Sequence, residues 1–283
     1  MNLTQDVEAK EQYKRLIIYV LVFVGFLALA PILRNLLESG FEDDRYSRLL
    51  AGIVSRALFL IPCCWYILNV MPFGVIGLNK RNRPVNWQAV VLPMIIILPV
   101  LFGNMSLFSS SPVELVVWFV LNNLLVAIVE EIVFRGLFLP RLIVLFKERS
   151  GTLILAVTVS ATVFGLIHYL NLIRQPDNFS GITSQVIFAI SIGIFLGGLY
   201  LRTEHIILPI LIHFLINITF GNDILKSEPL LHEATEKAES TDWASFVLTM
   251  SIFLFIAAGG IFMSKWSNKD RIVDLFLKIT KST

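Results

Sequence analysis

The sequence predicts an all-α, polytopic membrane protein with about eight transmembrane helices, and three observations support this fold class. Of the 283 residues, 56% are hydrophobic and only 16% are charged, against about 25% charged residues in ordinary soluble proteins. Apolar runs of about twenty residues recur along the chain, which is the length that crosses about 30 Å of hydrocarbon as a helix. The runs are continuously apolar rather than alternating, which favours helices over a β-barrel.

The predicted spans form a single membrane domain over residues 1–283, with no separate soluble domain. The connector "MPFGVIGLNKRNRPVNW" between the second and third spans is rich in Pro, Gly and Asn, as expected of a loop. The predicted spans are 14–35, 48–70, 88–107, 113–138, 152–172, 182–202, 204–220 and 243–265.

The distribution of Lys and Arg predicts the orientation of the spans, because cytoplasmic loops of membrane proteins are rich in these residues. With a cytoplasmic N-terminus, fifteen Lys and Arg residues fall on the cytoplasmic side and six on the opposite side. We therefore expect both termini in the cytoplasm, and the compactness of the chain favours a bacterial cytoplasmic membrane. Topology accounts for the basic residues, so the net charge of +2 gives no indication of a nucleic-acid partner.

Two further features have simple interpretations. Cys63 and Cys64 are adjacent in the second span, and we interpret them as small core residues, with reversible palmitoylation as the alternative. The run "HEATE" at 232–236 begins like the zinc-protease motif H-E-x-x-H. However, Glu236 stands where the second histidine is required, and the run lies in a predicted loop. We therefore do not predict a metal site there.

The fourth span contains ionisable residues at a depth where they are costly and need either a partner or a function. In "VEEIVFRG", residues 129–136, Glu131 and Arg135 are four positions apart, so they share a helix face and can neutralise each other. Glu130 is displaced by about 100° around the helix and lacks this partner. An unpaired carboxyl in apolar surroundings exchanges protons near neutral pH more readily than one in an ion pair. We therefore interpret Glu131 as structural and Glu130 as poised for chemistry.

Further polar residues lie in two later spans. "FGLIHYL" in the fifth span places Phe164 and His168 on one helix face, and "LIHFLIN" in the seventh does the same for His213 and Asn217. Each of the two histidines and Asn217, taken alone, is explained by hydrogen bonding between membrane helices. With Glu130, however, they supply a carboxylate, two imidazoles and an amide from three helices. A carboxylate with an imidazole can deprotonate water, and a second imidazole with an amide can stabilise an oxyanion. No nucleophile elbow with Ser or Cys is present, so the set favours acyl hydrolysis by direct attack of water.

The three motifs resemble those of a known family. "EEIVFR" matches the pattern E-E-x-x-x-R, "FGLIH" matches F-x-x-x-H and "HFLIN" matches H-x-x-x-N. In this order on successive apolar spans, they are similar to the CAAX-protease and bacteriocin-processing (CPBP, or Abi) family of intramembrane proteases. This family includes the endopeptidase that removes the last three residues from prenylated C-a-a-X proteins. The resemblance covers a predicted catalytic core at residues 113–222.

The resemblance also implies roles for individual residues. Glu130 would be the catalytic carboxylate, and His168 would help it to activate water. His213 and Asn217 would stabilise the oxyanion. The supporting residues of the family pattern would be Glu131, Arg135 and Phe164.

Family members are often described as metalloproteases, and the residues leave the cofactor open. Glu130, His168 and His213 could supply the three protein ligands of a catalytic zinc. A zinc-bound His213 would need an acceptor for its second N–H, and the seventh span offers no suitably placed carboxylate. Because a water activated by Glu130 and His168 requires no metal, we prefer a metal-independent mechanism and keep zinc as the alternative.

The leading prediction is therefore an intramembrane endopeptidase that acts on a membrane-associated peptide or lipidated protein. The scissile bond would lie in a prenylated CAAX-type tail or in an apolar leader, pheromone or bacteriocin-type peptide, and the compactness of the chain favours the peptides. One alternative is a non-catalytic scaffold or bacteriocin-immunity protein, although a scaffold need not keep all four polar residues. The other is a proton-coupled transporter, because Glu and His also form proton relays in membranes, although no internal repeat supports it. Nothing in the sequence specifies an oligomeric state.

The predicted topology can be tested with reporter fusions. We expect reporters inserted within residues 80–83 and within residues 233–239 to lie on opposite faces of the membrane, because an odd number of predicted spans separates the two segments. The measurement is the activity of a reporter that functions on one face only. Activity at both positions would contradict the predicted number of spans between them.

Overall fold

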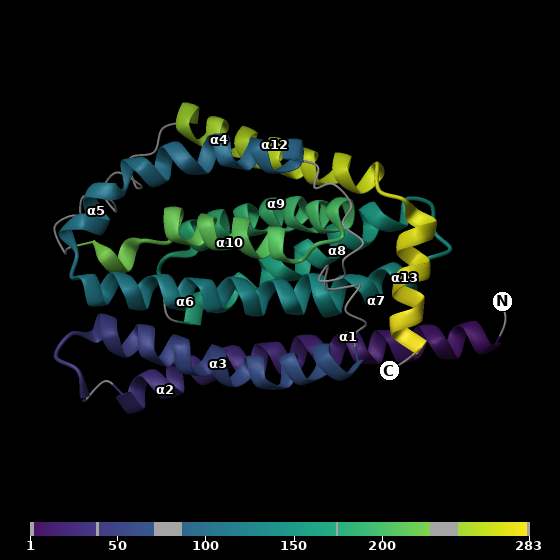
Figure 1. Cartoon of the computed structure of the whole chain (residues 1–283), viewed down its shortest axis with the longest axis horizontal. Helices are drawn as coiled ribbons and strands as arrows, with labels where there is room; N and C mark the ends of the chain where they lie inside the picture. Colours follow the sequence, from purple (N-terminus) through teal and green to yellow (C-terminus); the bar gives the residue numbers. More distant parts are fainter. Residues whose placement is uncertain (1–2, 38–39, 71–86, 174, 227–242, 282–283) are drawn as a thin grey trace.

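The computed structural model of the chain describes residues 3–37, 40–70, 87–173, 175–226 and 243–281. In this part of the chain the regular elements are helices and no strand is present, so the predicted all-α fold class is confirmed. The long helices lie roughly side by side along the longest axis of the molecule (Figure 1).

The first layer of the bundle is formed by the N-terminal helices. α1 (Leu3–Leu27) and α2 (Leu29–Leu37) follow each other with a break at Ala28, and together they contain the first predicted span. α3 (Asp44–Val70) runs back along them and packs against both α2 and the central helix α6 (Val113–Glu131).

The central layer carries the three motifs. α6 continues directly into a π-helix, η2 (Ile132–Phe138), and then into α7 (Leu139–Leu145). α8 (Thr152–Ile167) ends in the 3-10 helix η3 (His168–Ile173). The remaining elements of this layer are α9 (Phe179–Thr203), α10 (Ile207–Phe220) and the short 3-10 helix η4 (Asp223–Leu225).

A third layer lies on the other side of α9 and α10. It consists of α4 (Trp87–Gly103), the short α5 (Met105–Ser110) and α12 (Trp243–Lys265). The last helix, α13 (Lys269–Lys281), runs across one end of the bundle (Figure 1). Its buried Ile272 and Phe276 belong to the main hydrophobic core, and the ring of Phe276 lies 6.4 Å from that of Tyr200.

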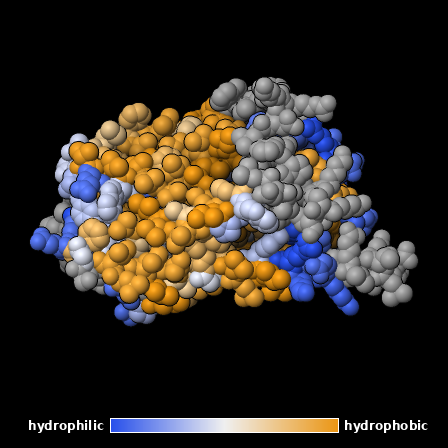
Figure 2. Space-filling model, turned by 60° about the horizontal axis from the view of Figure 1, so that its bottom comes forward, coloured by the Kyte–Doolittle hydropathy of each residue, from blue (hydrophilic) through white to orange (hydrophobic). Residues whose placement is uncertain are grey.

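The structure supports an integral, multi-pass membrane protein but not every predicted crossing. Among the described residues, six helical segments are long and apolar enough to span a bilayer, while Pro93–Gly103 and Ile207–Phe220 are shorter apolar helices. All eight predicted spans therefore contain an apolar helix, but length and composition alone support six crossings rather than eight. Figure 2 shows a broad hydrophobic surface with hydrophilic side chains towards its two ends, as expected for a protein in a bilayer.

Contacts between distant segments define the two ends of the bundle. At the end where α1 begins and α12 finishes (Figure 1), Arg271 Nη2 lies 2.7 Å from Glu204 Oε2. At the other end, Asn104 Nδ2 donates a hydrogen bond of 2.8 Å to the carbonyl oxygen of Thr219. α1 begins and α13 ends at the same end of the molecule (Figure 1). That this end is cytoplasmic stays a prediction.

The two cysteines have different environments. Cys63 is buried in the main hydrophobic core, whereas Cys64 is exposed on the surface of the bundle. Neighbouring residues on a helix point about 100° apart, so they rarely face the same core. The interpretation as core residues is therefore correct for Cys63 and wrong for Cys64, and palmitoylation stays open for Cys64. The "HEATE" run lies outside the described residues.

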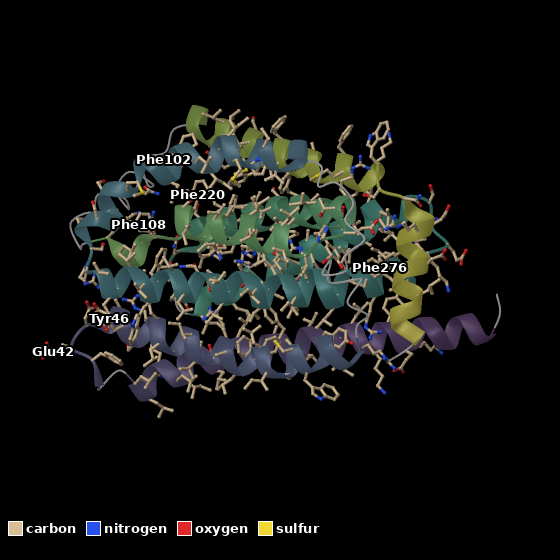
Figure 3. The ribbon with its side chains drawn as sticks, in the orientation of Figure 1. Glu42, Tyr46, Phe102, Phe108, Phe220 and Phe276 are labelled. Atoms are coloured by element: carbon tan, nitrogen blue, oxygen red, sulfur yellow. The ribbon has the colours of Figure 1, made fainter. Side chains whose placement is uncertain are left out.

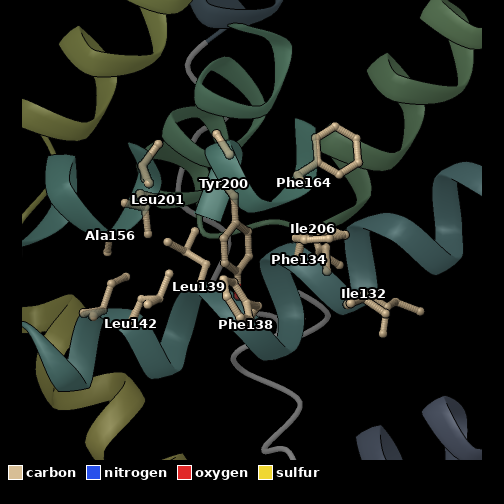
Figure 4. Packing of buried hydrophobic residues seen from close by; sticks show 14 of the residues in the cluster. Ile132, Phe134, Phe138, Leu139, Leu142, Ala156, Phe164, Tyr200, Leu201 and Ile206 are labelled. Atoms are coloured by element: carbon tan, nitrogen blue, oxygen red, sulfur yellow. The ribbon is translucent and has the colours of Figure 1, made fainter. Parts of the chain in front are cut away.

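The main hydrophobic core lies where η2 and α7 pack against α8 and α9. Phe134, Phe138 and Leu139 gather around Tyr200 in this core (Figure 4). Tyr200 is 1% exposed and Leu139 is fully buried. The core thus holds together the same helices that carry the candidate site.

Glycines on two faces of α9 allow its neighbours to approach closely. A Cβ atom added at Gly193 would lie 2.9 Å from the Cβ of Ala161 on α8, and one added at Gly198 would collide with the backbone carbonyl of Gly260 on α12. Small residues have this role in membrane proteins because close backbone contact replaces the missing hydrophobic drive for helix association. α9 is therefore fixed between α8 and α12.

We expect Gly198→Ala to lower the midpoint of thermal unfolding, because the new methyl group meets a backbone carbonyl rather than a movable side chain. Overpacking of this kind costs about 1–3 kcal/mol. Gly25→Ala in α1 is the matched control, since nothing lies within 4 Å of a Cβ at that position. Unfolding of both purified variants in the same detergent is the measurement, and equal midpoints for the two would contradict the packing argument.

Candidate active site

A buried carboxylate, that of Glu131, lies at the centre of the candidate site. Its Oε1 accepts a hydrogen bond of 2.8 Å from Arg135 Nη1 and contacts His213 Nδ1 at 2.7 Å. Glu131 is 0% exposed, and its other oxygen, Oε2, has no hydrogen-bond partner among the described residues. A carboxylate paired with a guanidinium is ionised and can only accept, so His213 Nδ1 donates. The predicted pair of Glu131 and Arg135 is present, and His213 joins it from α10.

Arg135 connects this carboxylate to two further helices. It is 2% exposed, its Nη2 donates a hydrogen bond of 3.1 Å to the carbonyl oxygen of Gly193 on α9, and its guanidinium lies 5.1 Å from the ring centre of Phe164 on α8. It belongs to η2, the π-helix that begins directly after Glu131. Single π-turns within α-helices often occur at functional sites. A buried guanidinium is tolerated here because a carboxylate, a carbonyl and an aromatic face surround it.

Glu130 lies on the other side of His213. Its Oε2 is 3.6 Å from His213 Nε2, and its side chain is 18% exposed whereas that of Glu131 is fully buried. A separation of 3.6 Å is too long for a direct hydrogen bond, but a water beside the pair can hydrogen-bond to both atoms. The two ring nitrogens of His213 therefore face two different glutamates, one buried and one accessible.

His168 contacts Phe164 rather than the two glutamates or His213. It follows the last residue of α8 and begins η3, so it lies where the helix type changes. Its Nδ1 donates a hydrogen bond of 3.0 Å to the backbone carbonyl of Phe164, since a carbonyl can only accept. This leaves the lone pair on Nε2. Within the described part of the chain, no hydrogen bond or ion pair joins His168 to Glu130.

The ring of Phe164 lies between the two histidines. Its centre is 5.1 Å from that of His168 and 6.0 Å from that of His213, with edge-to-face geometry in both cases. Edge-to-face packing is a favourable arrangement of aromatic rings. Phe164 thus restricts the orientation of both imidazoles.

Asn217 is placed by its helix rather than by side-chain contacts. It lies one turn after His213 on α10 and is half-buried, and its backbone carbonyl accepts a hydrogen bond of 2.8 Å from the N–H of Gly221. The side-chain amide makes no hydrogen bond to any other residue that the structure describes. Its N–H groups are therefore available to a ligand.

The contact between Glu131 and His213 is the functional feature that sequence reasoning missed. The two residues are 82 positions apart, and the spacing of residues within one helix gives no information about contacts between helices. The interpretation of Glu131 as purely structural is consequently incomplete, because Glu131 also holds a candidate catalytic histidine.

The predicted zinc ligands can be compared with this geometry. The seventh span offers no carboxylate to His213, as expected, but Glu131 on α6 accepts the hydrogen bond from Nδ1, so the expected lack of an acceptor is wrong. However, within the described ranges no three His, Cys, Asp or Glu side chains are grouped closely enough to hold a metal ion. Glu130 and His213 face each other, but His168 is not grouped with them. The three residues, as they lie here, do not fit a zinc site, and no step is assigned to a metal.

Comparison with known proteins identifies the same segment. The model of the family described as "Type II CAAX prenyl endopeptidase Rce1-like" matches residues 112–219. This segment is Rce1-like. The family resemblance predicted from the motifs is thereby confirmed, and the match extends from the start of α6 to the end of α10, so it includes all the candidate site residues. Neither the curated proteins nor the solved structures contain a protein that matches this chain.

We expect Glu131→Gln to lower the midpoint of thermal unfolding, because Arg135 and His213 lose the carboxylate that compensates them. Removing one partner of a buried ion pair costs about 3–5 kcal/mol. Glu114→Gln is the matched control, since Glu114 lies exposed in the first turn of the same helix. The two variants are compared with the unchanged protein by thermal unfolding in detergent. An unchanged midpoint for Glu131→Gln would show that the buried contacts are not needed for stability.

Proposed function

We propose that the protein is an intramembrane endopeptidase that hydrolyses a peptide bond with water as the nucleophile. The match to the Rce1-like family supports a CAAX-type protease. The observation that carries the proposed chemistry is the pair of Glu130 and His213, whose Oε2 and Nε2 atoms lie 3.6 Å apart at the accessible side of a buried ion network.

In the proposed mechanism, Glu130 is the general base. Its side chain is partly accessible and forms no ion pair with Arg or Lys among the described residues, so it can take a proton from a water held beside it. The water oxygen then bonds to the substrate carbonyl carbon, and the proton on Glu130 passes to the leaving nitrogen as the C–N bond breaks. His168, with its free Nε2, provides a second acceptor for the attacking water.

His213 and Asn217 stabilise the oxyanion that forms during attack. Because Nδ1–H of His213 is committed to Glu131, His213 can donate through Nε2 only as an imidazolium, which carries a proton on both nitrogens. The amide of Asn217, one turn further on α10, supplies a second donor.

The proposed substrate is a membrane-associated chain with its scissile bond near the membrane face. It is either a prenylated CAAX-type tail or an apolar leader, pheromone or bacteriocin-type peptide, and we favour the peptides. The proposed setting is a bacterial cytoplasmic membrane with both termini on the cytoplasmic side. A panel of farnesylated and unmodified peptides distinguishes the two substrate classes by which of them is cleaved.

We expect Glu130→Gln to abolish cleavage while the protein still folds, because the amide preserves the shape of the side chain but cannot accept a proton. Loss of a general base lowers the rate by about 10²- to 10⁴-fold. The measurement is the cleavage rate of the peptide panel by purified protein in detergent, together with the midpoint of thermal unfolding.

Glu114→Gln is the control for this experiment, since it makes the same change at an exposed position on the same helix. It should retain the activity of the unchanged protein. Cleavage by Glu130→Gln at the rate of the unchanged protein would refute the role of Glu130. Absence of cleavage of every peptide by the folded, unchanged protein would instead count against the endopeptidase and favour a non-catalytic role.

A further inference from the structure

An apolar cavity of about 460 Å³ lies between α4, α9, α10 and α12, apart from the candidate active site. All of its lining side chains are apolar except that of Thr249 on α12. Its volume lies in the range of about 300–1,000 Å³ that is typical of binding sites for small molecules. The cavity is therefore large enough to hold a ligand.

The lining indicates which chemistry can fill this space. An ordered water in a protein needs about two to four polar partners, and cavities without them stay dry. The hydroxyl of Thr249 is the single polar side-chain group in the lining. No charged side chain lines the cavity, so an ionic or peptide ligand would lose its hydration without compensation. A hydrocarbon chain needs no polar partner in the cavity and has no favourable hydration to lose.

The cavity extends from the outer surface of the bundle to its interior. Two lining residues, Phe220 and Ile252, are 47% and 38% exposed, whereas Ile192 and Ile216 are only 6% and 5% exposed. Phe220, labelled in Figure 3, lies between α10 and the layer of α4 and α5. The neighbouring outer surface of α12 is also hydrophobic, with Leu254 71% exposed. In a membrane-spanning helix such a surface lies in the hydrocarbon of the bilayer, so acyl chains are present at the entrance.

We propose that the cavity binds one acyl chain of a membrane phospholipid. The chain enters past Phe220 and Ile252 and reaches the buried Ile192 and Ile216, while its headgroup stays outside the cavity. Binding of an apolar chain in an apolar space restores the dispersion contacts that an empty cavity lacks.

The bound chain would also support the candidate active site, because α10 contributes side chains to both. Ile216 and Phe220 line the cavity, while His213 on the same helix contacts Glu131 and faces Glu130. A chain in the cavity therefore packs against the same helix that positions an imidazole, with Ile216 three residues after His213. This consequence depends on the proposed function, whereas the binding of the chain does not.

Photochemical labelling tests the proposal directly. The protein is placed in nanodiscs of phosphatidylcholine that carries a diazirine on one acyl chain, and the labelled residues are mapped by mass spectrometry after irradiation. We expect labels on the buried lining residues Ile192 and Ile216 as well as on exposed residues of α12 such as Leu254. Labels confined to the exposed residues would overturn the proposal.

A variant that fills the cavity provides the second arm. Ile256→Trp, on α12, inserts a large side chain into the cavity and should reduce labelling of Ile192 and Ile216 by about tenfold or more, equivalent to about 1.4 kcal/mol of binding free energy. Leu254→Trp is the matched control, because it makes the same kind of change at an exposed position outside the lining. Unchanged labelling in Ile256→Trp would overturn the proposal, and should this variant not fold, the labelling of the unchanged protein still decides.

A competitor identifies the source of the chain. A farnesylated peptide added in excess should leave the labelling of Ile192 and Ile216 unchanged if a phospholipid occupies the cavity. Loss of these labels on addition of the farnesylated peptide, but not of the unmodified peptide, would show that the cavity takes the lipid of a substrate and would overturn the assignment to a phospholipid. The labelling experiment does not measure peptide cleavage, so the result for lipid binding is independent of the result of the endopeptidase assay.

Discussion

The ion network around Glu131 is the interaction on which the rest of the candidate site depends. One carboxylate oxygen, buried completely, accepts from Arg135 at 2.8 Å and from His213 at 2.7 Å. Neither the carboxylate of Glu131 nor the guanidinium of Arg135 could remain charged in such a place alone, because an unpaired charge at low dielectric is very costly. Each therefore requires the other, and the hydrogen bond from His213 joins α10 to this pair of η2 and α6. This hydrogen bond fixes the position of His213.

The close packing of α9 is what allows the network to include a fourth helix. Arg135 reaches the carbonyl oxygen of Gly193 at 3.1 Å, and Gly193 has no side chain to hinder this approach. The same absence of a side chain lets α8 come close to α9 at Ala161, and α8 carries Phe164, over whose ring the guanidinium lies. The glycines of α9 thus serve two purposes, because they bring membrane helices together and they leave a backbone acceptor accessible to a buried charge.

The sequence predicted those parts of the structure that depend on one helix at a time. Hydropathy predicted all eight apolar helices, and the spacing of four residues predicted the pair of Glu131 and Arg135. The sequence could not predict that Ile207–Phe220 is shorter than a membrane-spanning helix, that Cys64 is exposed, or that His168 lies where α8 changes to a 3-10 helix. These depend on where the neighbouring helices end and how they pack. The contact of Glu131 with His213 was not predicted for the same reason. The spacing of residues within one helix gives no information about which residues of a neighbouring helix they contact.

The two adjacent glutamates show why one carboxylate would not be enough for the proposed chemistry. A carboxylate that compensates both Arg135 and His213 must stay ionised and buried, so it cannot also accept a proton from water without releasing its partners. A general base needs the opposite, because it must be reachable by water and must change its charge in each cycle. Adjacent positions on a helix differ in direction by about 100°, which is enough to bury Glu131 fully and to leave the Glu130 side chain 18% exposed. His213 lies between them, held by the first through Nδ1 and facing the second through Nε2, so the same residue connects the structural carboxylate to the one proposed to act.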